Sequence, residues 1–189
     1  MPHAADAPRE HVPRRILVAG TSGAGKSTLA RRIAAASGVP YAEIDALFHG
    51  RDWTPRPTFV ADVDAFTSQP GWVTEWQYDP VRELLADRAT TMVFLDYSRA
   101  RVMRQVVART VRRRTQREVL WNGNVEAPLH TIFSDPEHII RWAWNTHATR
   151  GELVAEAARR RPHLDVVRLR HPREAEAWLA ATFPFHLEP

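Results

Sequence analysis

The amino-acid sequence predicts an α/β domain built on a parallel β-sheet, and three observations lead to this fold class. A chain of 189 residues is long enough for one domain with its own hydrophobic core. Short apolar runs alternate with stretches of helical periodicity along most of the chain. A glycine-rich turn joins the first apolar run to the first helical stretch. We expect five parallel strands flanked by helices, in one domain over residues 14–184 that follows a flexible tail at 1–13.

Five segments have the composition of strands. The first (ILVA) is a short apolar run, and the fourth (TTMVFLDYS) is the clearest of the five. The second (VPYAEIDAL) is expected to end near Asp45. In chain order the five segments lie at residues 16–19, 39–47, 72–76, 90–98 and 163–170.

Helical patterns follow these strands. After the first strand, apolar residues recur at helical spacing, and Gly38 is placed to end that helix. In another stretch, Asp79 is the expected N-cap, with Pro80 at the first helical position. After the first helix, helices are expected at residues 58–69, 79–88 (the one that Asp79 begins), 98–115, 136–160 and 172–183.

The composition excludes several classes of site. The chain has no cysteine, which rules out disulfides and thiolate metal sites. No segment approaches the ~20 apolar residues of a membrane span, so we expect a cytoplasmic protein without a membrane partner. Lys26 is the only lysine among 26 basic residues. The high pI therefore reflects a bias towards arginine and is weak evidence for a nucleic-acid partner.

The lone lysine lies in the strongest motif of the sequence, GTSGAGKS at residues 20–27, which matches the phosphate-loop pattern G-x4-G-K-[ST]. In this motif backbone amides cradle phosphates, Lys26 reaches the β and γ phosphates, and Ser27 binds Mg²⁺. A glycine turn that binds nothing is the alternative, but the flanking strand and helix favour nucleotide binding. The predicted nucleotide-binding residues are Gly20, Ser22, Gly23, Ala24, Gly25, Lys26, Ser27 and Thr28.

Several phosphate-loop classes are excluded. With its only lysine already used, the chain cannot carry the N-K-x-D motif of GTPases, and L-S-G-G-Q of transport ATPases is absent. The chain is also too short for the usual helicase core with a lid domain. A small kinase remains.

Arginines are concentrated in one predicted helix. Residues 99–117 contain eight arginines and no acidic residue. Helical spacing places Met103, Val106, Val107 and Thr110 towards the body, with the arginines, Arg109 among them, on the other surface. The arginines can be a solvated face, a nucleic-acid surface or a group that neutralises a transferring phosphoryl group. No aromatic residue lies among them for base stacking, so nucleic acid is the least favoured partner.

The order of these motifs resembles the adenylate-kinase-like family, and most closely its branch of DNA topology modulation proteins. The resemblance rests on the phosphate loop, EIDALFHGRDW, GWVTEWQY, the arginine-rich helix, LWNGNVE and VVRLRHPREAEAWL. It implies a five-stranded sheet, ATP with Mg²⁺ as donor, and a mobile lid at about residues 109–134. In such a lid Arg109 and Arg113 would contact the phosphoryl group, the turn 122–124 would be a pivot, and Glu126 would orient an arginine.

The acceptor side is less defined. Asp45 is the expected base for a substrate hydroxyl, with a helix or turn cap as the alternative. Glu75 is the expected Mg²⁺ acid and Asp96 the second choice, while Trp76 replaces a family glycine and would fill or line the acceptor pocket. Arg170 and His171 would pack against adenine. Further pocket candidates are Arg51, Trp53, Arg56, Tyr78 and Arg82.

The identity of the acceptor stays open. A small-molecule hydroxyl and a nucleotide both fit a phosphotransferase of this kind. A nucleotide-dependent nucleic-acid-binding protein and an ATPase that only hydrolyses are alternatives from other functional classes. Neither the oligomeric state nor the pathway follows from the sequence.

Overall fold

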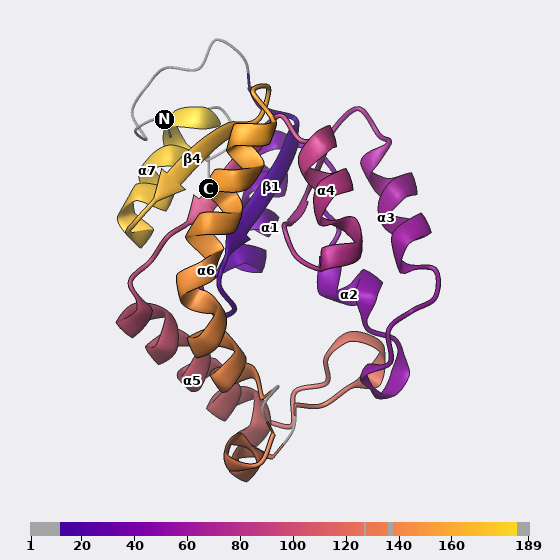
Figure 1. The fold of residues 1–189 in the computed structure, drawn as a ribbon, viewed down its shortest axis with the longest axis vertical. Helices are drawn as coiled ribbons and strands as arrows, with labels where there is room; N and C mark the ends of the chain where they lie inside the picture. Colours follow the sequence, from indigo (N-terminus) through magenta and orange to yellow (C-terminus); the bar gives the residue numbers. More distant parts are fainter. Residues whose placement is uncertain (1–11, 127, 136–137, 185–189) are drawn as a thin grey trace.

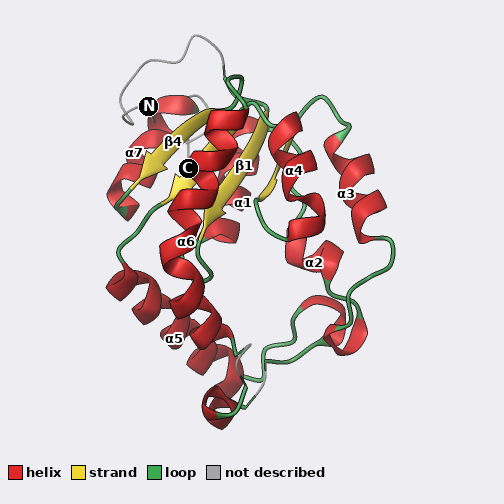
Figure 2. Cartoon of the chain, in the orientation of Figure 1, coloured by secondary structure: helices red, strands yellow, loops and turns green. Residues whose placement is uncertain are grey.

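Four parallel strands form the centre of the computed structural model, which describes residues 12–126, 128–135 and 138–184. Their order in the sheet is β2-β1-β3-β4, and helices lie on both sides (Figures 1 and 2). The parallel α/β architecture is therefore confirmed. Residues 1–11 of the expected tail lie outside the described residues. The strands are β1 (Arg15–Gly20), β2 (Trp72–Glu75), β3 (Thr91–Leu95) and β4 (Asp165–Leu169).

The expected strand at 39–47 is wrong, so the described sheet has four strands and not five. Tyr41 makes only an isolated parallel bridge to Val73 beside β2, and the chain then turns into the short helix α2 (Ile44–Phe48). The Ile44 amide donates to the Glu75 carboxylate at 3.0 Å instead of extending a ladder. Consequently Asp45 lies in the first turn of a helix and not at the end of a strand.

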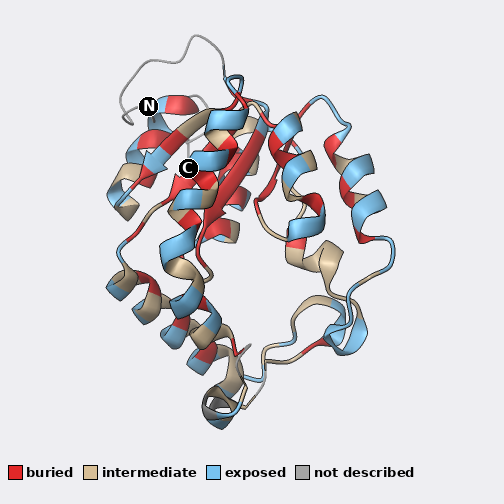
Figure 3. Ribbon diagram, viewed as in Figure 1, coloured by how far each residue is buried: buried red, intermediate tan, exposed pale blue. Residues whose placement is uncertain are grey.

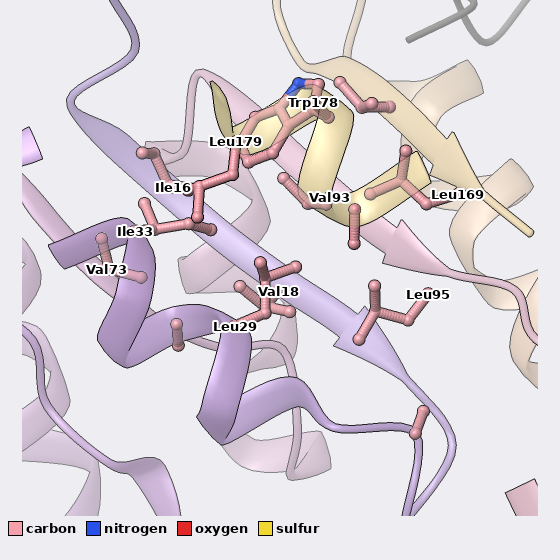
Figure 4. Close-up of a cluster of buried hydrophobic side chains, with 14 of the residues drawn as sticks. Ile16, Val18, Leu29, Ile33, Val73, Val93, Leu95, Leu169, Trp178 and Leu179 are labelled. Carbon is pink, nitrogen blue, oxygen red and sulfur yellow. The ribbon is translucent and has the colours of Figure 1, made fainter. Parts of the chain in front are cut away.

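Both faces of the sheet are covered by helices, which explains the continuous apolar runs of the strands. Ile16 and Val18 of β1 point into one core cluster, shown in Figure 4, together with side chains of α1 (Lys26–Ser37) and α7 (Pro172–Thr182). Leu17 and Ala19 point into the opposite cluster. The helices of that second face are α3 (Phe59–Thr67), α4 (Asp79–Arg88) and α6 (Ile139–Arg160).

Helix α5 (Arg99–Thr115) follows β3 and packs along α6, away from the sheet (Figure 1). Figure 3 shows that burial is concentrated in the sheet and on the inner sides of the helices around it. Among the described helices, none combines the length and hydropathy that crossing a membrane requires.

Two helix ends test the sequence signals. Gly38 ends α1 at a φ of 70°, and its amide donates to the Ala34 carbonyl at 2.9 Å, as expected. The N-cap of α4 is Tyr78 and not Asp79, which is the first helical residue. The Tyr78 ring stacks on Phe48 with centroids 3.9 Å apart. This packing fixes where the chain enters α4, so the tertiary contact overrides the local capping preference.

Candidate active site

The loop at residues 20–27 joins β1 to α1 at the carboxyl edge of the sheet, where parallel α/β folds bind ligands. Gly25 is the N-cap of α1 at a φ of 95°, and Lys26 is the first helical residue. The predicted strand–turn–helix geometry is therefore present. The backbone amides at the N-terminus of a helix are a type of site that can bind an anion such as phosphate.

Position 23 needs a glycine for two reasons, its backbone conformation and its close approach to α5. Its φ is 86°, and a Cβ added there would lie 2.7 Å from the Cβ of Val106 on α5. Gly38 has a φ of 70° with nothing within 4 Å of an added Cβ.

We expect Gly38→Ala to cost about 1 kcal/mol of unfolding free energy from backbone strain alone. Gly23→Ala should cost clearly more, because α5 must also move. Urea unfolding compares the two variants, and equal losses would contradict the α5 contact.

Lys26 is buried, with 7% of its surface exposed. Its Nζ donates to the Thr21 carbonyl at 3.3 Å. Burial, and next the positive charge of Arg150, lower the pKa of Lys26 to about 8. A phosphate at the loop would oppose both effects, so the lysine is placed to gain strongly from an anionic ligand.

Ser27 and Glu75 lie together beside the loop. Burial is the main cause that raises the pKa of Glu75, and the Ser27 hydroxyl is near enough to the carboxylate to oppose this rise. The carboxylate accepts hydrogen bonds from the Tyr41 hydroxyl at 2.7 Å and from the Ile44 amide. A hydroxyl and a carboxylate suit a hydrated Mg²⁺ ion. The described residues contain no group of three or more His, Cys, Asp or Glu able to hold a metal, so the ion would also need phosphate oxygens and water.

Asp45 is held by two hydrogen bonds to the same oxygen. Its Oδ1 accepts from Gln77 Nε2 at 2.8 Å and from the Tyr78 hydroxyl at 2.7 Å. None of the described residues bonds Oδ2, which leaves that atom to a ligand. The charge of Asp45 raises the pKa of Lys26, so the carboxylate and the lysine are close enough to interact electrostatically.

Arg109 faces inward, and the expected outward orientation is wrong. Val102 and Val106 of α5 are buried against the body, and Arg109 follows on the same face, whereas Val107 is 40% exposed. Arg109 Nε is buried without a hydrogen-bond partner among the described residues. Burial, and next the charge of Arg113, lower the pKa of Arg109. A buried, unpaired guanidinium of this kind favours an anionic ligand.

Arg113 is held by acidic partners. Its Nη1 donates to Glu126 Oε1 at 3.1 Å, its Nε lies 3.5 Å from Glu118 Oε1, and its guanidinium lies over the Trp121 ring. Glu126 therefore orients an arginine, as expected. Arg113 is less available to a ligand than Arg109, because its charge is already paired.

Arg150 is the residue that the sequence did not reveal. It lies on α6 and is 9% exposed, and its Nε and Nη1 have no hydrogen-bond partner among the described residues. Burial, and next the charge of Arg82, lower the pKa of Arg150. In a chain with 25 arginines no local pattern distinguishes this one; only the packing of α6 against the site does.

Other predicted site residues have different surroundings. Trp76 is in the core and not in the pocket it was expected to fill: it is 1% exposed, and its Nε1 donates to the Arg82 carbonyl at 3.0 Å. Asp96 is paired with Arg168, with Oδ2 2.7 Å from Nε. Near the end of β4, Arg170 is exposed, and His171 is the N-cap of α7 with Nε2 3.2 Å from Arg101.

Comparison with known proteins identifies the fold. No protein-family model and no curated protein matches the sequence. A gluconokinase from Sinorhizobium meliloti 1021 aligns over 93% of this chain and 96% of its own, with 22% identity and a TM-score of 0.51. The shikimate kinase from Acinetobacter baumannii, solved with shikimate, aligns over 95% of this chain and 97% of its own, with 16% identity and a TM-score of 0.56. The chain therefore shares the fold of these kinases.

Proposed function

We propose that the protein is an ATP-dependent phosphotransferase that moves the γ-phosphoryl group of ATP to a small acceptor. The observation that carries this proposal is the loop at 20–27 with Lys26 at the start of α1, where the charges of Asp45, Glu75, Arg109 and Arg150 all act on the lysine. Two proteins that share this fold are a gluconokinase and a shikimate kinase, which supports the proposal. Placement in the branch of DNA topology modulation proteins remains part of the proposal.

The donor side uses the loop and the residues around it. Amides of the loop and the N-terminus of α1, from Ser22 to Thr28, bind the phosphates, and Lys26 contacts the β and γ groups. Ser27 and Glu75 would hold Mg²⁺, which would supply charge neutralisation at the phosphate oxygens. Arg109, assisted by Arg113, neutralises charge on the transferring group, and Arg170 and His171 lie where adenine is proposed to pack.

The acceptor side uses Asp45 as general base. Gln77 and Tyr78 fix its Oδ1, so Oδ2 is oriented to accept the proton of a substrate hydroxyl. The oxygen thus activated would attack the γ phosphorus in line. Closure of the arginine-bearing lid at about residues 109–134 would exclude water from this step.

The unpaired guanidinium of Arg150 indicates an anionic acceptor. Its Nε and Nη1 are buried without a partner among the described residues, whereas the neighbouring Arg82 is paired with Asp79, with Nη2 2.5 Å from Oδ1. A carboxylate or phosphate on the acceptor would satisfy these donors, whereas a neutral acceptor would leave them unpaired.

This assignment predicts the effect of replacing Arg150. Arg150→Met keeps the volume in the interior but removes the charge, and we expect a rise of about 100-fold in the acceptor KM, equal to the loss of a 2–3 kcal/mol charged hydrogen bond. The Kd for ATP should change far less. Steady-state kinetics at saturating ATP measure the effect, and Arg160→Met on the exposed end of the same helix is the control. An unchanged acceptor KM would contradict an anion contact.

The experiment that tests the function is ADP release from ATP and Mg²⁺, screened against matched pairs of acceptor pools. Nucleoside monophosphates are compared with nucleosides, and hydroxy acids with neutral sugars. 5′-Hydroxyl oligonucleotides form a separate pool. Turnover well above background in an anionic pool alone would support both the kinase and its anion site. No response in any pool, with ATP binding intact, would contradict the proposed function.

A further inference from the structure

Two hairpin loops far apart in the sequence have the same backbone conformation. The first covers residues 49–55 and the second residues 119–125, and each is closed by one antiparallel bridge. In each, the second amide donates to the sixth carbonyl at 2.7 Å, and the sixth amide donates to the third carbonyl at 3.2 or 3.3 Å. The central residue of each turn has a positive φ, 55° at Asp52 and 57° at Asn122.

The two hairpins pack against each other through Asn124, which is 5% exposed. Its Oδ1 accepts from the Trp53 amide at 3.0 Å. Its Nδ2 donates to the carbonyls of Gly50 and Trp121, both at 2.8 Å. Asn122 Nδ2 adds a bond to the His49 carbonyl at 2.5 Å. We call this pair of hairpins the clasp.

Each half of the clasp is tied to a functional group. On the first hairpin, His49 Nε2 lies 3.0 Å from the Tyr78 hydroxyl, which in turn donates to Asp45. The second hairpin is followed directly by Glu126, which binds Arg113 on α5. The His49 and Trp121 rings stack across the join with centroids 5.7 Å apart. The clasp thus connects the proposed base to the proposed lid arginines.

We propose that Asn124 is a positioning residue that, through the clasp, holds the lid arginines of α5 at a fixed position relative to Asp45. This inference rests on the proposed function. A side-chain amide is needed because it offers one acceptor and two donors at once, and a carboxylate of the same shape offers no donor. Loss of these contacts leaves the arginines and the base on separate segments, and misplacement of the reacting groups lowers the rate of transfer.

The test compares Asn124→Ala and Asn124→Asp with the control Asn145→Ala, an exposed asparagine on α6. We expect both Asn124 variants to lower kcat for transfer by about 10- to 100-fold with the Kd for ATP changed less than about threefold. Asn122→Ala removes one exposed bond, so it should have a smaller effect in the same direction and guards against a folding artefact. Hydrolysis without acceptor should fall less than transfer, because water needs no positioning by the clasp.

A structural readout separates this inference from the proposed function. The chain has no cysteine, so spin labels at Arg51→Cys and Val119→Cys report the distance between the hairpins without background. We expect a narrow distance distribution with Asn124 and a broad one with Asn124→Ala. Unchanged transfer in the Asn124 variants, or an unchanged label distance, would overturn the positioning role. A wild-type protein that transfers to no acceptor would instead overturn the proposed function, while the label distance still decides whether Asn124 holds the clasp.

Discussion

Arg109→Ala is expected to lower phosphoryl transfer by about 10³- to 10⁵-fold, the range of an arginine that stabilises the transition state. The reason is the position of Arg109: it is mostly buried, its Nε has no partner among the described residues, and its charge acts on Lys26. Single-turnover transfer at saturating ATP measures the loss. Arg109→Lys should restore little, because lysine lacks the planar fork of donors.

The same substitution should not destabilise the ligand-free protein. Burial and the charge of Arg113 already disfavour the charged form of Arg109. Removing this guanidinium therefore removes an unfavourable contribution to the free energy of folding. We therefore expect a Tm equal to or above that of the wild type together with a severe loss of transfer. Arg104→Ala, on the exposed side of the same helix, should leave both unchanged. Transfer within about tenfold of wild type would contradict a transition-state role for Arg109.

The parts that the sequence predicted correctly are those whose determinants are contiguous. The loop at 20–27 and the helix that follows it depend on glycines and an apolar period within a few residues of each other. The same holds for β3, which is apolar after Thr91 and buried at every position. In these segments local preference and tertiary packing agree, so the pattern is sufficient.

The errors occur where a distant residue decides the conformation. The expected strand at 39–47 is cut short because Glu75, 31 positions after Ile44, accepts the Ile44 amide. Arg109 faces the interior because its helix packs with Val106 against Gly23. The periodicity of the helix alone does not reveal this contact with a distant loop. Asn124 pairs with Gly50 across 74 positions, so LWNGNVE indicates a turn but not its partner. The burial of Arg150 likewise follows from the packing of α6.

Asp45→Asn is expected to lower transfer to a hydroxyl acceptor by about 10²- to 10⁴-fold, the usual contribution of a general base. Asparagine has the same shape, and its Oδ1 can still accept from Gln77 and Tyr78. The local structure should therefore persist, and the Kd for ATP should stay within a few-fold of wild type. The matched control is Asp64→Asn, because Asp64 is a carboxylate on α3 that is paired with Arg88 of α4.

The outcome also distinguishes the two acceptor chemistries. A hydroxyl must lose its proton as it attacks, so transfer to it needs the Asp45 carboxylate. A phosphate acceptor is already ionised at neutral pH and needs no base, and there the negative charge of Asp45 would repel the acceptor. Transfer that survives in Asp45→Asn therefore assigns a phosphate acceptor, bound by Arg150, and leaves Asp45 a structural partner of Tyr78. Loss of transfer with intact ATP binding indicates that the acceptor group is a hydroxyl. The anionic group that Arg150 binds is then a second group on the same acceptor molecule.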